Sequence, residues 1–371
     1  MKIVVGLSGG VDSSVAAYLL QKQGHEVIGL FMRNWNDASV TLEDECPWIE
    51  DSNDALLVAK KLGIPFQVID MSELYKERIV DYMFAEYEKG RTPNPDVLCN
   101  REVKFDVFLE TALSLGADKV ATGHYARLDS FTNENGEEVY QLLAGKDNNK
   151  DQSYFLCQLS QKQLSKALFP IGELTKPEVR QIAEELDLPV AHKKDSTGIC
   201  FIGERDFREF LKNYIPAKSG KMVDIVSKKV IGEHQGIMYY TIGQRKGLGI
   251  GGNGEPWFVV GKDYDKNILY IAQGDSNKWL LSHGALITDV NWISATKPEG
   301  EYDCTAKFRY RQKDNDVSLH FIDETTLYVT FKKPIKAVTP GQAAVFYDGD
   351  VCLGGGTIDK VYKDGKEIDY L

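Results

Sequence analysis

Short apolar runs alternate with segments of helical periodicity in the first third of the chain. Residues 2–7 form an apolar run that predicts a buried strand, and residues 13–23 repeat apolar positions three and four apart before Gly24. The same alternation continues through 26–32, 51–62, 66–71, 72–89, 105–115 and 119–122. Strands that are buried on both faces and separated by helices are typical of a parallel sheet. The first 125 residues therefore predict a doubly wound α/β domain.

The pattern changes after residue 129. The dipeptide Asn135-Gly136 between the strand-like runs 129–131 and 139–142 predicts a hairpin. Helices are expected over 161–167, 176–186 and 205–214, after which strand-like runs separated by glycine clusters continue to the C-terminus. We expect domain boundaries near residues 215 and 280.

Charge is distributed unevenly along the 371 residues. The chain has 44 Lys and Arg against 55 Asp and Glu, a net charge of −11, which by itself disfavours an anionic partner such as nucleic acid. Residues 1–140 contain 13 basic and 24 acidic residues, so residues 141–371 contain 31 of each. Because the whole imbalance lies in the first 140 residues, a nucleic-acid partner stays open for the rest of the chain.

The cysteines and the hydropathy pattern indicate a cytoplasmic protein with no membrane span. No apolar stretch approaches 18 residues. The six cysteines form no C-x-x-C pair, so neither a disulfide scaffold nor a zinc site is indicated. Any functional cysteine is expected to act as a thiol.

The segment Ser8-Gly-Gly-Val-Asp-Ser-Ser14 lies between the first predicted strand and the first predicted helix. Ligands bind at this end of a doubly wound sheet, and two glycines, a helix start and three hydroxyls suit an anion. The Walker lysine and the G-x-G-x-x-G pattern are both missing, which disfavours a kinase-like NTPase and a dinucleotide dehydrogenase. The simpler alternative is a capped helix after a glycine turn.

A second group of chemical residues follows in the segment from Arg91 to Asn100. Asn94-Pro95 predicts a helix start, and Asp96 and Cys99 are then three residues apart on its first turn. The helix dipole favours a thiolate there, and the carboxylate can act as acid or base. Cys99 is alternatively a small buried hydrophobe, although a proline-flanked polar loop argues against a core position.

Cys200 lies between Gly198 and Gly203, where a structural and a functional role are equally compatible with the pattern. Sequence separation does not show whether Cys99 and Cys200 meet in space.

These motifs together resemble one enzyme family. Ser8–Ser14 is similar to the PP-loop of ATP pyrophosphatases. The loop and the motifs that follow it along the chain closely resemble those of the tRNA-specific 2-thiouridylases. These motifs lie at residues 94–100, 122–127, 150–156, 198–203, 240–249 and 308–311. The resemblance implies a PP-loop domain over 1–214, a small central domain over 215–279 and a C-terminal β-barrel over 280–371. It also implies that ATP, with Mg²⁺, adenylates the C2 oxygen of the wobble uridine in tRNA before sulfur replaces AMP.

The resemblance assigns roles to individual residues. It implies that Cys200 carries the sulfur as a persulfide and that Cys99 attacks this persulfide. The outcome would be either release of sulfide onto the activated base or a Cys99–Cys200 disulfide. Asp96 would be the acid/base. Asn94, Pro95 and Asp96 would line the target base. The implied ATP-binding residues are Gly6, Leu7, Ser8, Gly9, Gly10, Val11, Asp12, Ser13, Met32 and Gly123, and the implied tRNA contacts are His124, Lys150, Asp151, Gln152, Arg309, Tyr310 and Gln342. Without the resemblance, Met32 is more typical of a core and His124 of a structural histidine.

A basic surface for RNA is predicted near residue 310. If 307–313 is a strand, its alternation places Lys307, Arg309, Arg311 and Lys313 on one face, which suits phosphates. The alternative is a solvated edge strand protected by its charges. Because the region is neutral on balance, we expect modest RNA affinity with a shallow salt dependence.

The expected partners are tRNA and a sulfur-donor protein, either a cysteine desulfurase or a sulfur-relay protein, and the chain is expected to be a monomer. Two other functions fit part of the pattern: a PP-loop enzyme that condenses a small metabolite, and a non-catalytic RNA-binding protein that is ordered by ATP. An iron–sulfur cluster is disfavoured, because clusters usually need more cysteines than this region offers.

Overall fold

The N-terminal part is built on a parallel sheet, as the sequence predicts. The computed structural model describes residues 1–34, 47–195, 211–212, 214–216, 218–252, 254–294, 298 and 300–370. Five strands run in the order β3-β2-β1-β4-β7, and every neighbouring pair is parallel. They are β1 (Lys2–Gly6), β2 (Glu26–Arg33), β3 (Phe66–Asp70), β4 (Lys119–Ala121) and β7 (Ala167–Leu168). The predicted α/β fold class is confirmed.

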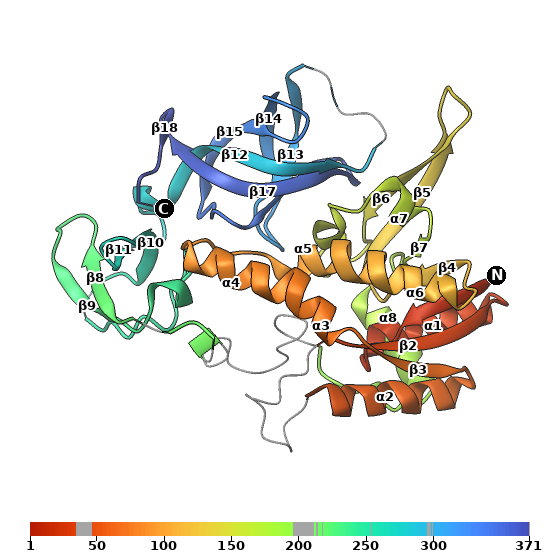
Figure 1. Cartoon of the computed structure of the whole chain (residues 1–371). Helices are drawn as coiled ribbons and strands as arrows, with labels where there is room; N and C mark the ends of the chain where they lie inside the picture. The colour runs from red at the N-terminus through yellow and green to blue at the C-terminus, as the bar shows by residue number, and fades with distance from the viewer. Residues whose placement is uncertain are drawn as a thin grey trace.

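Helices cover both faces of this sheet (Figure 1). The helices of this part of the chain are α1 (Val11–Lys22), α2 (Pro47–Leu62), α3 (Ser72–Tyr75), α4 (Asp81–Glu88), α5 (Pro95–Cys99), α6 (Phe108–Ser114), α7 (Gln161–Leu164) and α8 (Lys176–Glu185). π-Helical segments, Lys76–Val80 and Asn100–Val107, join α3 to α4 and α5 to α6. The helix predicted over 105–115 therefore begins ten residues earlier, at Pro95.

The predicted hairpin is present, but it belongs to a different sheet. Strands β5 (Ala126–Thr132) and β6 (Glu138–Ala144) pair antiparallel, and Gly136 takes the left-handed conformation in the turn. Strand β6 also pairs with the distant β17 (Val351–Lys363), through Leu142 with Cys352 and Leu143 with Val351. The hairpin thus extends the C-terminal sheet and connects it to the segment that follows β4.

The rest of the described chain is mainly antiparallel strand. A four-stranded sheet of order β10-β11-β8-β9 forms the central part, from β8 (Gly220–Asp224), β9 (Val230–His234), β10 (Trp257–Asp263) and β11 (Ile268–Gln273). The C-terminal strands are β12 (Leu281–Trp292), β13 (Tyr302–Lys307), β14 (Asn315–Phe321), β15 (Leu327–Lys336), β16 (Ala343–Asp348), β17 and β18 (Lys366–Glu367). Pairing of β12 with both β15 and β17 closes this sheet into a barrel around Phe308, Phe346 and other buried apolar side chains.

The helix that ends with α4 connects the N-terminal sheet to the central strands (Figure 1). The Tyr264 hydroxyl donates to the Tyr87 carbonyl at 2.8 Å. A Cβ at Gly90 would lie 2.4 Å from the Tyr264 ring, so glycine is required where the helix ends. The three parts of the chain therefore meet around the residues that immediately precede α5.

None of the described helices is long and apolar enough to cross a membrane. Cys157, Cys304 and Cys352 are free thiols. Cys200 and most of the helix predicted over 205–214 lie outside the described residues. The boundaries near 215 and 280 stay predictions.

Candidate active site

The phosphate loop occupies the carboxyl end of β1, as predicted. Helix α1 begins at Val11, two residues earlier than the sequence pattern suggested, so Asp12 lies within its first turn. Gly10 is the N-cap residue, and no side chain caps the first amides of α1 among the described residues. A helix start without a side-chain cap, at the positive end of the dipole, leaves N–H groups for an anion.

Two glycines bring separate segments against this loop. Gly9 has φ +75°, and a Cβ there would lie 2.2 Å from the backbone oxygen of Asp51. Gly123 follows β4, and a Cβ on it would lie 2.6 Å from the backbone nitrogen of Ser13. Both positions exclude a side chain, which explains why glycine occurs there and places Gly123 beside the loop.

The serine side chains brace the loop from within. Ser13 Oγ accepts a hydrogen bond from the Ser8 amide at 3.2 Å and lies 3.2 Å from Ser8 Oγ. The Ser14 hydroxyl donates to the Gly10 carbonyl at 2.7 Å. Ser13 and Ser14 are buried, whereas Ser8 is exposed. The exposed Ser8 hydroxyl is therefore the serine donor of this loop that an incoming phosphate meets first.

Asp12 is held by two partners that are distant in sequence. Its Oδ1 accepts from the Tyr125 hydroxyl at 2.8 Å and from Lys176 Nζ at 2.7 Å. Burial, followed by the charge of Asp12, raises the pKa of Tyr125, so its hydroxyl stays a donor. Lys176 is 8 % exposed and is the first residue of α8. A lysine ammonium is thus fixed beside the phosphate loop, although the loop itself contains no lysine.

A second carboxylate, Asp195, connects three cations next to Asp12. It contacts Lys150 at 2.5 Å, Lys176 at 2.8 Å and Arg180 at 2.7 Å. Burial raises the pKa of Asp195, but hydrogen bonds from Lys150 and Lys176 outweigh burial and hold the pKa well below its ordinary value. The group as a whole has more cations than carboxylates and can accept a polyanion.

Lys176 was missed by the sequence reasoning. A lysine at the first position of a helix opposes the helix dipole, and that anomaly was the available signal. Thr175 and Glu178 form a capping box around it, which fixes where the helix starts. The backbone of Lys176 also donates to Asp147 Oδ2 at 2.9 Å.

The predicted start of α5 is confirmed, but its cysteine is buried. The Asn94 side chain accepts from the Val97 amide at 3.4 Å, and Pro95 occupies the first turn with Asp96. Asp96 is partly exposed, whereas Cys99 is 1 % exposed and belongs to a large apolar cluster. The expectation that this segment is a poor place for core residues is wrong. Asn94 and Asp96 are partly exposed, while the Cys99 thiol is buried.

His124 lies in a buried aromatic environment. Its Nδ1 is 2.7 Å from the Thr122 hydroxyl, and its ring contacts Phe105 and Phe169. Burial lowers the pKa of His124 well below its ordinary value, so the imidazole is neutral. The residue is structural in this conformation, and a contact with tRNA would require its exposure.

Asp151 and Gln152 also have intramolecular partners. Asp151 Oδ1 accepts from the amides of Gly145 and Ser153 at 3.0 Å, and its Oδ2 contacts Lys307 Nζ at 3.3 Å. Gln152 Oε1 accepts from the Tyr125 amide at 3.1 Å. These bonds shape the segment that follows the hairpin.

The strand predicted over 307–313 is wrong. Strand β13 ends at Lys307, Phe308 is fully buried, and Arg311 has φ +63°. Lys307 points to Asp151 and lies over the Tyr347 ring rather than beside Arg309 on a basic face. Phe308, which alternation placed on the face opposite the cations, is buried where the strand ends. The turn that follows separates the cations from one another.

Arg309 and Gln342 tie the domains together. Arg309 donates to the Ile242 carbonyl at 2.5 Å and to the Thr339 hydroxyl at 2.7 Å. The Gln342 amide donates to the Thr92 carbonyl at 2.8 Å and to the Pro93 carbonyl at 3.3 Å. Gln342 therefore holds the segment that leads into Asn94 and α5. Tyr310 packs on Phe155 with ring centroids 4.4 Å apart.

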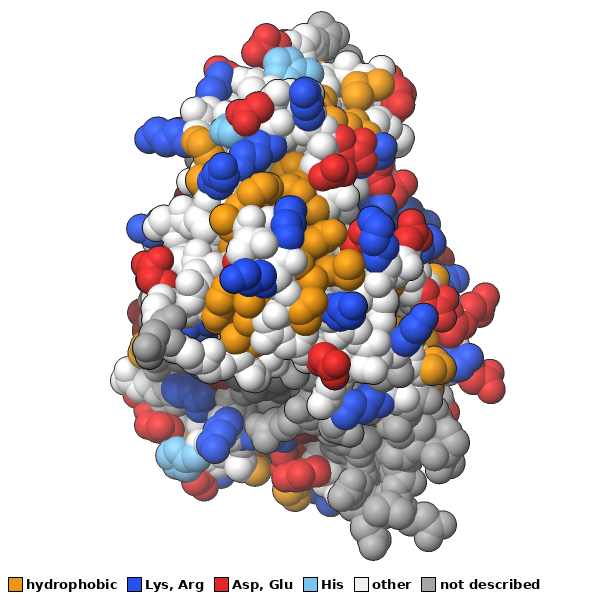
Figure 2. All heavy atoms as spheres, turned by 90° about the vertical axis from the view of Figure 1, so that its left-hand side faces the viewer, with side chains coloured by type: hydrophobic (Ala, Val, Ile, Leu, Met, Phe, Trp, Pro, Cys, Tyr) orange, Lys and Arg blue, Asp and Glu red, His pale blue; other side chains and the backbone are white. Residues whose placement is uncertain are grey.

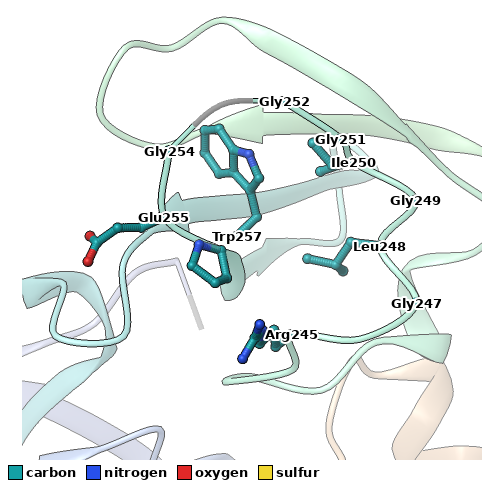
Figure 3. Close-up of a pocket in the computed structure, with 11 residues that line it drawn as sticks. Arg245, Gly247, Leu248, Gly249, Ile250, Gly251, Gly252, Gly254, Glu255 and Trp257 are labelled. Carbon is teal, nitrogen blue, oxygen red and sulfur yellow. The ribbon is translucent and has the colours of Figure 1, made fainter.

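A cavity of about 420 Å³ lies within the glycine-rich segment of the central domain (Figure 3). The indole of Trp257 and the side chain of Arg245 line it, while Glu255 points away from them (Figure 3). Arg245 and Lys246 are exposed. On the face viewed in Figure 2, Lys and Arg side chains are dispersed among apolar and acidic ones rather than gathered in one block. Indole and guanidinium groups are both side-chain types that stack on nucleobases.

Three family models match consecutive parts of the chain. They are the tRNA methyl transferase HUP domain over residues 1–204, the tRNA methyl transferase PRC-barrel domain over 208–273 and the aminomethyltransferase beta-barrel domain over 282–358. A 4-thiouridine synthetase solved with RNA and bound ATP is 17% identical, with a TM-score of 0.34, over 54% of this chain and 44% of that chain. That likeness is too low to support an inference.

Curated relatives match along the whole length. The proteins named tRNA-specific 2-thiouridylase MnmA from Bacillus cytotoxicus and Bacillus cereus are each 55% identical over 370 residues, which cover 100% of this chain and 98% of each relative. The first of the family models alone spans more than half of the chain. The chain therefore belongs to the MnmA family of tRNA-specific 2-thiouridylases.

Proposed function

We propose that this protein is a tRNA 2-thiouridylase that adenylates the C2 oxygen of the wobble uridine with ATP and then replaces AMP by sulfur. The observation that carries the proposal is the 55% identity to the thiouridylases along the entire chain. The phosphate loop supports it, because the loop offers uncapped helix amides and a hydroxyl without the lysine of a kinase-like site.

ATP is proposed to bind at the carboxyl edge of the parallel sheet. Gly6 to Ser13 would contact the phosphates, and Met32 and Gly123, at the ends of neighbouring strands, would flank the adenosine. Mg²⁺ usually takes one or two carboxylates together with substrate phosphates, so Asp12 fits as its protein ligand. Lys176, already bonded to Asp12, would neutralise the pyrophosphate as it leaves.

Sulfur transfer is proposed to use two cysteines and one carboxylate. Cys200 would carry a persulfide, and the Cys99 thiolate would attack the Cys200 sulfur and release sulfide. The sulfide would then attack C2 of the uridine and displace AMP. The same attack that expels the sulfide leaves a Cys99–Cys200 disulfide, which an external thiol reduces. Asp96 would exchange the proton with the base, which Asn94 and Pro95 would line. Because Cys99 is 1 % exposed, tRNA binding must uncover its sulfur.

The partners are also proposals. The substrate is tRNA, and His124, Lys150, Asp151, Gln152, Arg309, Tyr310 and Gln342 are its proposed contacts. The persulfide would come from a cysteine desulfurase or a sulfur-relay protein, and the enzyme would act as a cytoplasmic monomer. The proposed domains are 1–214, 215–279 and 280–371.

The test is a thiolation assay with unmodified tRNA, ATP and a persulfide donor. Formation of 2-thiouridine is measured by mass spectrometry, and AMP and pyrophosphate are measured separately. Cys99→Ser and Cys200→Ser should abolish thiolation and the AMP release that accompanies it, while the pyrophosphate released by adenylation is still detected. Cys304→Ser is the matched control, because this free thiol lies in the barrel strand β13 and should leave the activity unchanged.

Four outcomes would contradict the proposal. Full activity of both cysteine variants would remove the persulfide mechanism. ATP binding without tRNA-dependent release of AMP would favour a non-catalytic RNA-binding protein, and adenylation of a small metabolite would favour the condensing enzyme. Methylation of tRNA by S-adenosylmethionine without thiolation would support the activity that the family models' descriptions suggest.

A further inference from the structure

A small cavity lies where the three parts of the chain meet. Its volume is about 150 Å³, and residues from all three parts line it: 89–92 after α4, Ile242, Lys262 and Tyr264 from the central part, and Thr339 and Pro340 before β16. We call it the junction cavity. The space would hold a few waters or one tetrahedral oxyanion, since a water takes about 30 Å³.

The cavity contains an ammonium group whose charge is not neutralised by a neighbour. Lys89 pairs with Glu86, and Arg91 pairs with Glu86 and Asp359. In the described part of the chain, Lys262 Nζ has no carboxylate within ion-pair distance and donates only to the Gly90 carbonyl, at 3.2 Å. Lys262 is 7 % exposed, and burial lowers its pKa to about 7. A buried cation without an anion is costly, so an anion in this cavity would be stabilised.

A second polar group in the cavity lacks a partner. The Thr92 hydroxyl is buried and makes no hydrogen bond within the described structure. A buried hydroxyl without a hydrogen-bond partner is unfavourable, so such groups usually face a water or a ligand. Lysine and threonine together provide an ammonium and a hydroxyl donor, the set that commonly binds phosphoryl oxygens.

We propose that the junction cavity binds one phosphoryl anion, held by the Lys262 ammonium and the Thr92 hydroxyl. Neither side chain is among the proposed contacts to ATP, the uridine or tRNA. The anion is either free, as inorganic phosphate, or a backbone phosphate of tRNA, and only the second source rests on the proposed function. The Thr92 backbone carbonyl accepts a hydrogen bond from the Gln342 side-chain amide, and Thr92 precedes Asn94 by two residues, so the anion would stiffen the approach to α5.

The test titrates inorganic phosphate into the full chain, followed by calorimetry and by the ³¹P linewidth. A non-hydrolysable ATP analogue fills the phosphate loop during the titration. Lys262→Met removes the charge, Thr92→Val removes the hydroxyl, and Lys266→Met is the control, because Lys266 is exposed and pairs with Asp263. The wild type and the control should bind one phosphate. We expect binding at least about tenfold weaker in Lys262→Met and several-fold weaker in Thr92→Val.

A tRNA arm distinguishes the two sources. If phosphate competes with tRNA, and Lys262→Met lowers the slope of log affinity against log salt by about 0.7, the occupant is a tRNA phosphate. If phosphate binds equally well with tRNA present, the occupant is free. Both results support the site, and neither requires thiolation activity.

The proposal is overturned if Lys262→Met and Thr92→Val bind phosphate like the wild type. It is also overturned if phosphate does not bind and the salt slope for tRNA is unchanged in both variants. Thr92→Val keeps the test decisive should Lys262→Met not fold, because valine is isosteric with threonine.

Discussion

The phosphate loop and the domain junction differ in how their residues find their partners. In the loop, Ser8, Gly10, Ser13 and Ser14 bond to one another within a few residues of sequence. At the junction, Arg309 bonds to a residue 67 positions away and Gln342 to one 250 positions away. The first arrangement is a property of a short segment, whereas the second depends on how the three parts pack together.

This difference shows what each region can do before a substrate binds. The helix amides and glycines of the loop already have the arrangement that suits a phosphate, so ATP can bind without a rearrangement of the loop. The side chains that the family resemblance assigns to tRNA hold the protein together instead. If these side chains contact tRNA as proposed, we infer that tRNA binding must break some of their bonds within the protein. Because Gln342 holds the segment in front of Asp96 and Cys99, loss of its bonds would change that segment as well.

The largest expected effect tests the preformed loop. Gly9→Ala forces a side chain to within 2.2 Å of the Asp51 carbonyl, so the loop must shift, and we expect AMP release to fall by about two orders of magnitude. Gly24→Ala is the matched control, because Gly24 also has a positive φ but faces open space. Equal loss of activity in both variants would show that backbone strain, and not loop position, explains the effect.

Next in size is the ammonium beside the loop. Lys176→Met leaves Asp12 and Asp195 with one cation fewer where the pyrophosphate forms, and we expect AMP release to fall by about 10–100-fold. Lys176→Arg should recover part of the rate, and Lys61→Met, which removes an exposed ion pair with Asp187, should have no effect. An unchanged rate in Lys176→Met would remove this residue from the reaction.

The junction is tested by Gln342→Ala, for which we expect about a tenfold lower rate of thiolation. The variant loses the bonds to the carbonyls of Thr92 and Pro93, so amide hydrogen exchange over residues 92–98 should also accelerate without tRNA. The control is Gln21→Ala, which breaks a similar bond to the Leu62 carbonyl far from the junction. A higher KM for tRNA with unchanged exchange would mean that Gln342 acts only as an RNA contact.

Acid stability should depend on Asp195. The pKa of Asp195 is lower in the folded chain than its ordinary value near 4. Below about pH 4 the carboxylate is therefore protonated in the unfolded chain and still ionised in the folded chain. The free energy of unfolding consequently decreases as the pH falls. Denaturant unfolding between pH 5 and 3 should show a smaller loss for Asp195→Asn than for the wild type. Asp187→Asn, at an exposed side chain, should behave like the wild type. An identical loss in all three would contradict the assignment.

The smallest expected effect concerns salt. Because cations are dispersed and many of them are paired internally, we expect tRNA affinity to fall with salt at a slope of about −0.7 for each neutralised phosphate, with few phosphates involved. Binding is measured from low to moderate potassium chloride. A slope that requires about ten phosphates would show a larger basic surface than the described residues present.

The acidic excess of the first 140 residues has a partial structural explanation. Asp51 and Asp54 both pair with Lys193, at 2.7 and 2.5 Å. The backbone oxygen of Asp51 also packs against Gly9. These carboxylates help position the phosphate loop, so part of the acidity is structural and does not oppose RNA elsewhere on the surface.

Local signals in the sequence were sufficient for the α/β sheet, the hairpin, the cap at Asn94 and the phosphate loop. Each of them depends on periodicity, on glycine and proline geometry or on a helix start, which act over a few residues. The same reasoning failed for 307–313, because β13 ends at Lys307 and the backbone then turns, with Arg311 at φ +63°. It also failed for Cys99, since the π-helical continuation and the apolar cluster decide which side of α5 faces inward.

By itself, the sequence determined the chemistry that this chain carries and the order in which it appears: an anion loop, a carboxylate near a cysteine and a second cysteine. Only the tertiary structure decided that Lys176 joins Asp12, that the hairpin extends the barrel and that Gln342 holds the start of α5. These contacts join segments far apart in the chain, and they form because packing buries the side chains together. No local pattern encodes which distant segment a side chain will meet.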